Sequence, residues 1–338
     1  MTLTTRRIGR TDLCVPTLGF GGAPLGGLLG AANDSEASKT LATALDQGLT
    51  YVDTAPFYGF GRSERLVGDG LRGRNYTLST KVGRVLHPGI PDDPGAMGWP
   101  DPLPFHPVYD YSYDGVMRSF EASLQRLGLD RIDILYVHDI GAVTHGDANA
   151  QHVHDLKTGG YRALDELRQA GRIKAIGLGV NEEQACLEAL DYGDWDVFLL
   201  AGRYTLLEQG PLDGLMAACL KRDMSIVLGG PFNSGILVGG RTWNYGDAPD
   251  AIVQKVRALS ECCRAYDVPL PAAALQFPLG HAAVASVIPG LRTRKELADT
   301  LDWVSLDIPQ DLWKALKDKG LLAQNAPVPI SNPYTSVA

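Results

Sequence analysis

Short runs of apolar residues alternate with amphipathic stretches along most of this 338-residue chain. Eight of these runs are continuous and rich in β-branched residues, which is typical of strands that are buried on both faces of a parallel sheet. The predicted strands are residues 17–22, 50–55, 76–82, 132–139, 173–180, 197–202, 225–230 and 283–290.

The stretches between the strands have the periodicity of helices. In residues 115–127, the apolar positions Val116, Phe120, Leu124 and Leu127 fall on one helical face, and the stretch stops at Gly128. The predicted helices are residues 35–48, 115–127, 161–170, 182–192, 211–222, 251–266 and 294–301.

Eight alternations without a break in composition predict an α/β fold, a (β/α)8 TIM barrel that forms a single domain over residues 1–338. A doubly wound sheet is the alternative. Residues 4–16 precede the first strand and indicate a short hairpin with its turn at residues 9–12. Residues 84–113 and 233–249 are expected to be long loops at the C-terminal mouth of the barrel, and the first is a candidate pocket wall.

Charge and composition narrow the class of protein. The net charge of −8 argues against partners that need basic patches, namely nucleic acids and anionic membranes. The chain has no run of about 18 apolar residues, and its N-terminus lacks the apolar core of a signal peptide. Five cysteines without a C-x-x-C motif suit a reducing compartment. We therefore expect a cytoplasmic enzyme with a small-molecule substrate and no metal.

Candidate chemistry lies at the ends of successive strands. Asp53, Lys81 and His138 end or nearly end the second, third and fourth predicted strands, and Tyr58 follows Asp53 closely. One such residue is usually a cap or a solvated group, but in a barrel all four would face the C-terminal mouth, where barrel active sites lie. Aromatic residues, among them Phe57, are candidates for the substrate pocket, and so is Trp243.

These residue types form a coherent acid–base unit. A tyrosine that titrates near 10 carries protons poorly at neutral pH, and a neighbouring Lys81 would lower the pKa of Tyr58. Asp53 would pair with Lys81, and His138 would donate a hydrogen bond to the reacting oxygen. The set suits proton transfer to or from a carbonyl or alcohol while a cofactor moves a hydride.

Five segments resemble the aldo-keto reductase family in order and spacing: YVDTAPFYGFGRSERLVGDGL, STKVGR, LYVHD, IGLGVN and VIPGLRTRKEL. The resemblance implies a nicotinamide cofactor and a catalytic set of Asp53, Tyr58, Lys81 and His138. It also implies that Asn181 holds the nicotinamide carboxamide. The family's usual glutamine and stacking tyrosine are replaced here by Ala201 and Gly229.

The resemblance also places the rest of the cofactor. The implied contacts are Gly230, Pro231, Phe232, Gly235 and Leu237 near the pyrophosphate, and Gly290, Arg292, Thr293 and Glu296 near the adenosine. Glu296 occupies a position that is often arginine in members that use NADP. A carboxylate there would repel a 2′-phosphate, so NAD is expected to be preferred over NADP.

Finer segments, such as LLAGRYTLLEQG and GGPFNSGIL, resemble a branch of the family that contains dehydrogenases of aldoses and of pyridoxal. The branch implies oxidation of a cyclic hemiacetal to a lactone, with either pyridoxal or an aldose such as L-fucose as the substrate. One alternative is an NADPH-dependent reductase of aldehydes or ketones. A more remote alternative is a regulatory subunit without catalytic activity.

Overall fold

A computed structural model describes residues 2–28, 30 and 33–335. Its main sheet has eight parallel strands, and the bridges from Leu18 to Val287 and from Gly21 to Gly290 join the first strand to the last. The strands are β3 (Phe20–Gly21), β4 (Tyr51–Asp53), β5 (Thr77–Val82), β8 (Ile134–His138), β9 (Ala175–Val180), β10 (Val197–Ala201), β11 (Ser225–Gly229) and β14 (Val284–Ile288). Each lies inside a predicted range, and the expected barrel is confirmed.

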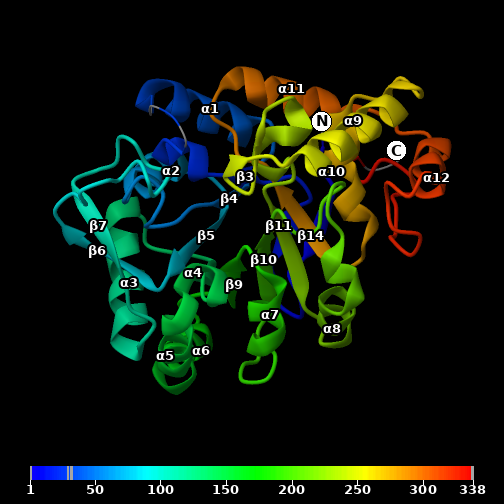
Figure 1. The fold of residues 1–338 in the computed structure, drawn as a ribbon. Helices are drawn as coiled ribbons and strands as arrows, with labels where there is room; N and C mark the ends of the chain where they lie inside the picture. The colour runs from blue at the N-terminus through cyan, green and yellow to red at the C-terminus, as the bar shows by residue number, and fades with distance from the viewer. Residues whose placement is uncertain (1, 29, 31–32, 336–338) are drawn as a thin grey trace.

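Helices surround these strands, as Figure 1 shows. The helices that match predicted stretches are α1 (Asp34–Asp46), α3 (Tyr113–Leu127), α6 (Tyr161–Gln169), α7 (Glu183–Ala189), α8 (Leu215–Lys221), α9 (Asp250–Arg264) and α11 (Arg294–Ser305). Helix α3 starts two residues earlier than predicted, because the Ser112 side chain caps it by accepting from the Gly115 N–H at 3.1 Å. It ends as predicted at Gly128, whose φ is 61°.

Other helices of the outer layer fall outside the predicted stretches. They are α2 (Arg62–Leu71), α4 (Ala142–His145), α5 (Asn149–Asp155), α10 (Leu270–Gln276) and α12 (Gln310–Asp318). Helix α2 contains Gly68 and Gly70, which weaken its helical signal. A Cβ on Gly68 would lie 1.7 Å from the carbonyl oxygen of Leu127, so this glycine lets α2 approach α3 closely.

The two segments expected to be long loops contain short antiparallel hairpins. In the first, β6 (Arg84–Pro88) pairs with β7 (Phe105–Tyr109). In the second, β12 (Thr242–Trp243) pairs with β13 (Gly246–Asp247). Because they follow the C-terminal ends of β5 and β11, both hairpins lie at the mouth of the barrel, as expected of these segments.

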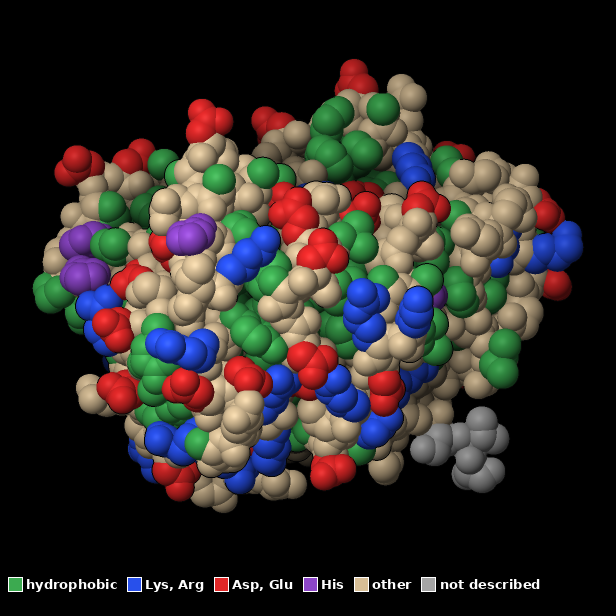
Figure 2. All heavy atoms as spheres, turned by 90° about the horizontal axis from the view of Figure 1, so that it is seen from below, with side chains coloured by type: hydrophobic (Ala, Val, Ile, Leu, Met, Phe, Trp, Pro, Cys, Tyr) green, Lys and Arg blue, Asp and Glu red, His purple; other side chains and the backbone are tan. Residues whose placement is uncertain are grey.

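The surface carries mixed charge. On the face drawn in Figure 2, basic and acidic side chains lie interspersed with each other and with apolar side chains. Within residues 2–28, 30 and 33–335, no helix has the length and hydrophobicity that a membrane span requires.

The predicted N-terminal hairpin is confirmed, and it covers the N-terminal end of the barrel. Strand β1 (Thr5–Arg7) pairs with β2 (Cys14–Pro16). Ile8, Leu13 and Val15 are buried together with inward-facing residues of the barrel strands, such as Tyr136 and Val227. The hairpin therefore closes the N-terminal end of the barrel and leaves the opposite end for chemistry.

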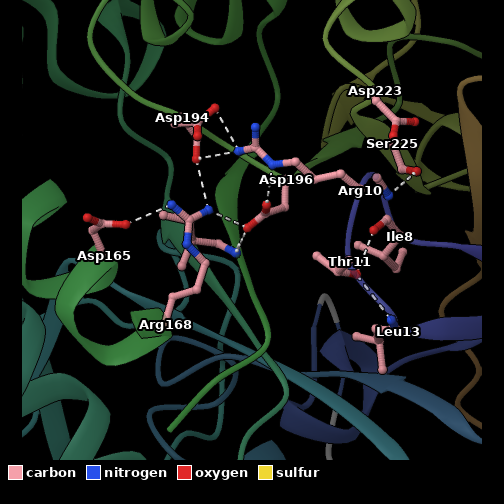
Figure 3. Close-up of polar contacts among 12 residues, drawn as sticks. Ile8, Arg10, Thr11, Leu13, Asp165, Arg168, Asp194, Asp196, Asp223 and Ser225 are labelled. Atoms are coloured by element: carbon pink, nitrogen blue, oxygen red, sulfur yellow. Dashed lines mark hydrogen bonds and ion pairs between the residues drawn. The ribbon is translucent and has the colours of Figure 1, made fainter. Parts of the chain in front are cut away.

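An ion-pair network fixes the hairpin turn to the barrel (Figure 3). Asp196, which precedes β10 and has a side chain only 3% exposed, accepts from Arg168 at 2.7 Å and lies 3.4 Å from Arg10 Nε. It also accepts from the Ile176 N–H at 3.0 Å. Gly9 has a φ of 47°, and a Cβ there would lie 2.4 Å from the Asp196 carbonyl oxygen. Only a glycine fits so tightly against the strand end.

Candidate active site

The four residues expected to carry the chemistry converge at one end of the barrel. Asp53 ends β4 and His138 ends β8, while Lys81 is the last residue but one of β5. These three strands are neighbours in the sheet. Tyr58 lies in the connection from β4 to α2. The barrel thus gathers a carboxylate, an ammonium group, an imidazole and a phenol at its C-terminal mouth.

Lys81 and Asp53 form a buried ion pair. Lys81 Nζ donates to Asp53 Oδ2 at 2.7 Å and to the carbonyl oxygen of Thr54 at 2.8 Å. The other carboxylate oxygen of Asp53 accepts from the Ser79 hydroxyl at 2.7 Å. Burial raises the pKa of Asp53, and Lys81 opposes that shift. Each partner therefore compensates the charge of the other where water does not reach.

The Tyr58 ring lies beside Lys81, whose Nζ is 4.6 Å from the ring centroid. Burial raises the pKa of Tyr58 well above 10, and the carboxylates of Asp53 and Asp139 add to this shift. The net lowering of the pKa expected from Lys81 does not occur, because the effect of burial outweighs that of the positive charges nearby. The phenol is therefore held in its protonated form.

His138 is buried, and burial, Arg84 and Lys81 lower its pKa well below 6.5. Its Nδ1 has no hydrogen-bond partner among the described residues, and its Nε2 lies 3.5 Å from Asp139 Oδ2. The backbone carbonyl of His138 accepts from the Tyr111 hydroxyl at 2.7 Å. A neutral imidazole carries one N–H group, so His138 can donate one hydrogen bond to an oxygen beside it.

A cavity of about 380 Å³ opens beside these side chains. Its polar lining consists of Tyr58, Lys81, His138, Asp139, Asn181 and Tyr245. Most of the remaining lining is apolar and includes Phe57 and Trp99, whose rings meet edge to face with centroids 5.5 Å apart. Such a cavity suits a small ligand with a polar reacting end and apolar surface elsewhere.

A second cleft of about 550 Å³ adjoins this cavity, since Tyr58 and Tyr245 line both. Predicted cofactor contacts that line it are Gly230, Pro231, Phe232, Gly235, Gly290, Arg292 and Glu296. Gly230 and Gly235 have φ values of 58° and 98°, which favour glycine and leave the backbone open to a phosphate. The carboxylate of Glu296 can accept hydrogen bonds from a ribose. The residues present therefore fit a dinucleotide.

The model of the aldo/keto reductase family matches residues 17–320. The chain belongs to the aldo/keto reductase family. It is 46% identical over 334 residues to the pyridoxal 4-dehydrogenase of Microbacterium luteolum, covering 94% of this chain and 98% of that protein. It is 37% identical over 338 residues to the D-threo-aldose 1-dehydrogenase of a Pseudomonas species, covering 95% and 99%. The protein is therefore an oxidoreductase that works with a nicotinamide cofactor.

Solved structures of aldo/keto reductases share this fold. A glycerol dehydrogenase from Gluconobacter oxydans has a TM-score of 0.72 at 20% identity, covering 98% of this chain and 99% of that one. The holo form of an aldo-keto reductase from Bacillus halodurans has a TM-score of 0.71 at 24% identity, with the same coverage. At these identities the likeness concerns the fold alone.

Three residues were predicted to contact the cofactor or the substrate but line neither the cavity nor the adjoining cleft of this aldo/keto reductase. Leu237 is fully buried in the hydrophobic core. The Thr293 side chain caps α11 by accepting from the Glu296 N–H at 3.1 Å. Trp243 packs against the core and donates its indole N–H to Glu208 at 2.8 Å. Their side chains are therefore taken up by contacts within the protein.

Sequence reasoning missed other residues of the cavity. Trp99 lies in the segment expected to be a pocket wall, so composition indicated the region but not the residue. Tyr245 comes from the β12–β13 hairpin, and its hydroxyl lies 3.4 Å from Asn181 Oδ1. Arg84 and Asp139 form an ion pair at the edge of the site. The position of Asp139 next to His138 was the available signal for that pair.

Proposed function

We propose that this aldo/keto reductase oxidises a cyclic hemiacetal to a lactone, with pyridoxal as its substrate and NAD as its preferred cofactor. The cavity beside Tyr58 and His138 carries the proposal, because a polar reacting centre meets an apolar, aromatic lining there. Pyridoxal closes on itself as a hemiacetal and presents a flat aromatic ring. An aldose carries hydroxyl groups around its ring and would need polar partners on most sides.

The residues of the site divide the proton chemistry among them. Tyr58 accepts the hydroxyl proton of the hemiacetal while the same carbon loses a hydride, so that a lactone carbonyl forms. The cofactor, when bound, supplies the hydride acceptor and a positive charge that favours the phenolate of Tyr58. Lys81 favours the same form of Tyr58. The neutral His138 donates a hydrogen bond to the reacting oxygen.

We expect the purified protein with NAD to oxidise pyridoxal with a kcat/KM at least about tenfold higher than that for L-fucose, D-arabinose or L-galactose, a difference of about 1.4 kcal/mol. Initial rates of NADH formation measure this preference, and mass spectrometry identifies the lactone. Faster oxidation of an aldose would contradict the choice of substrate. Reduction of aldehydes with NADPH, without oxidation of any hemiacetal, would contradict the proposed reaction itself.

The preference for NAD is supported by the charges at the adenosine end of the cleft. Glu296 and Asp299 both line the cleft there. Of the nearby cations, Arg294 lies 3.2 Å from Glu36, which is not among the residues lining the cleft, and Lys295 lies 2.6 Å from Asp299 and is paired with that carboxylate. Carboxylates facing a ribose accept from its free 2′-hydroxyl and repel a 2′-phosphate.

We expect the wild-type protein to bind NAD more tightly than NADP and Glu296→Arg to narrow or reverse the difference. Dissociation constants for both cofactors, measured by fluorescence titration, test this without turnover. Glu121→Arg, on an exposed position of α3, makes the same charge change away from the cleft and should leave the ratio unchanged. A wild-type preference for NADP of about tenfold or more would show that Arg292, which also lines the cleft, dominates.

A further inference from the structure

A second buried ion pair lies beside the reacting centre, between Arg84 and Asp139. The Arg84 side chain is 6% exposed and that of Asp139 is 14% exposed. The guanidinium carbon of Arg84 lies 3.8 Å from the ring centroid of Phe57 and 5.1 Å from that of Tyr109, so two aromatic rings hold it in place. Neither Arg84 nor Asp139 belongs to the Asp53–Lys81 pair or to the cofactor cleft.

The backbone holds Asp139 in an uncommon conformation. Its φ is 46°, in the left-handed region that residues with side chains seldom adopt. The conformation comes directly after the end of β8, and the Asp139 N–H donates to the Gly179 carbonyl at 2.9 Å. A strained residue at the edge of a reacting centre indicates that the position of its side chain matters.

The Asp139 carboxylate contacts a different functional residue with each oxygen. Oδ2 lies 3.5 Å from His138 Nε2, and Oδ1 accepts from Asn181 Nδ2 at 3.3 Å. All three residues line the cavity. One carboxylate therefore connects the imidazole that faces the reacting oxygen with the amide on the adjacent strand end.

We propose that Asp139, held by Arg84, is a positioning residue that keeps the proton of His138 on Nε2 and fixes the orientation of the Asn181 amide. The proposal rests on the function proposed above, because it assumes that His138 hydrogen-bonds the reacting oxygen.

The tautomer of His138 follows from its surroundings. A neutral imidazole holds its proton on either nitrogen, and the neighbouring group decides which. Nε2 faces a carboxylate, whereas Nδ1 has no partner among the described residues, so the proton is favoured on Nε2. The distance of 3.5 Å is longer than an ordinary hydrogen bond. The Nε2–H group therefore remains available to donate a hydrogen bond to a substrate oxygen, while the carboxylate still selects the tautomer.

The carboxylate of Asp139 also orients the amide of Asn181. A carboxylate can only accept hydrogen bonds, so Asp139 draws the amide nitrogen toward itself. The amide oxygen is left on the side of the Tyr245 hydroxyl, 3.4 Å away. Tyr245 lines both the cavity and the cofactor cleft, so the carbonyl of Asn181 is presented near the boundary between them.

Nitrogen-15 NMR of histidine-labelled protein tests the tautomer without turnover. His138→Gln identifies the signals of His138 by their loss. We expect a single tautomer with the proton on Nε2 in the wild type and a mixture of tautomers in Asp139→Ala. Asp196→Ala is the matched control, because it removes a buried carboxylate paired with an arginine at the opposite end of the barrel. An unchanged tautomer in Asp139→Ala would overturn the proposal.

Kinetics and binding provide the second measurement. We expect Asp139→Ala to lower kcat about 10- to 100-fold, the size of effect that follows the loss of a group that orients a metal-ligating histidine. The dissociation constant for NAD should also rise several-fold, while Asp196→Ala lowers stability and leaves both values near wild type. Arg84→Lys, which keeps the cation but loses the planar fork, should give an intermediate kcat. If Asp139→Ala does not fold, Asp139→Asn should show the same changes at smaller size.

The two proposals can fail separately. If the wild type oxidises hemiacetals and Asp139→Ala keeps its tautomer and its kcat, only the positioning role is wrong. If the wild type forms no lactone while the tautomer still depends on Asp139, the proposed reaction is wrong and the positioning of His138 stands.

Discussion

Tyr58→Phe is expected to lower kcat for hemiacetal oxidation by about 10²–10⁴-fold, the usual cost of removing a general acid–base group. The substitution removes only the hydroxyl that accepts the proton, and the ring remains against Lys81 and Trp99. The dissociation constant for NAD should therefore change little. Steady-state kinetics together with a cofactor titration separate these two effects.

The pH dependence of the oxidation rate is a second test of the role of Tyr58. Burial raises the pKa of Tyr58, and oxidation needs the deprotonated phenol, so the wild-type rate should increase from about pH 7 to about pH 10. Tyr58→Phe should lose this dependence. Tyr204→Phe is the matched control, because it deletes a buried hydroxyl that has no partner among the described residues. Activity of Tyr58→Phe within a few-fold of the Tyr204→Phe variant would remove Tyr58 from the mechanism.

The fold could be predicted largely because the strands of a closed parallel barrel are buried on both faces. This environment demands continuous apolar runs, such as residues 175–180, in which every residue is buried. Helix α2 was missed because close packing against α3 demands Gly68, and glycine is also the residue that weakens a helical pattern. Tertiary packing therefore overrode the local signal at that point.

The candidate site could be predicted where the topology fixes it. Asp53, Lys81 and His138 lie at or near the ends of strands, and parallel strands must bring their ends together. Tyr245 depends on the path of a hairpin that no local pattern predicts. The pKa of Tyr58 was predicted in the wrong direction, because a neighbouring charge is visible in a sequence whereas the burial of a side chain is not.

Lys81→Met is expected to abolish most turnover and also to lower the free energy of unfolding by about 3–5 kcal/mol, since it leaves one member of a buried ion pair without its partner. Activity that survives should shift to higher pH, because the phenol of Tyr58 loses a positive neighbour. Lys314→Met, which breaks an exposed pair with Asp318 on α12, should leave both properties nearly unchanged. Denaturant unfolding and a pH–rate profile measure the two effects.

The stability loss should itself depend on pH, and a second substitution should relieve it. Burial already raises the pKa of Asp53 above its unfolded value, and the loss of Lys81 removes the group that opposes the shift. A carboxyl whose pKa is raised by folding destabilises the protein progressively as pH rises from about 4, the unfolded value, toward the folded one. Lys81→Met should therefore be closest to wild-type stability in acid.

Adding Asp53→Asn removes the uncompensated charge and should restore most of the stability at neutral pH, but not the activity, because the ammonium group beside Tyr58 is still missing. Recovery of turnover in the double variant would show that Lys81 serves only to neutralise Asp53.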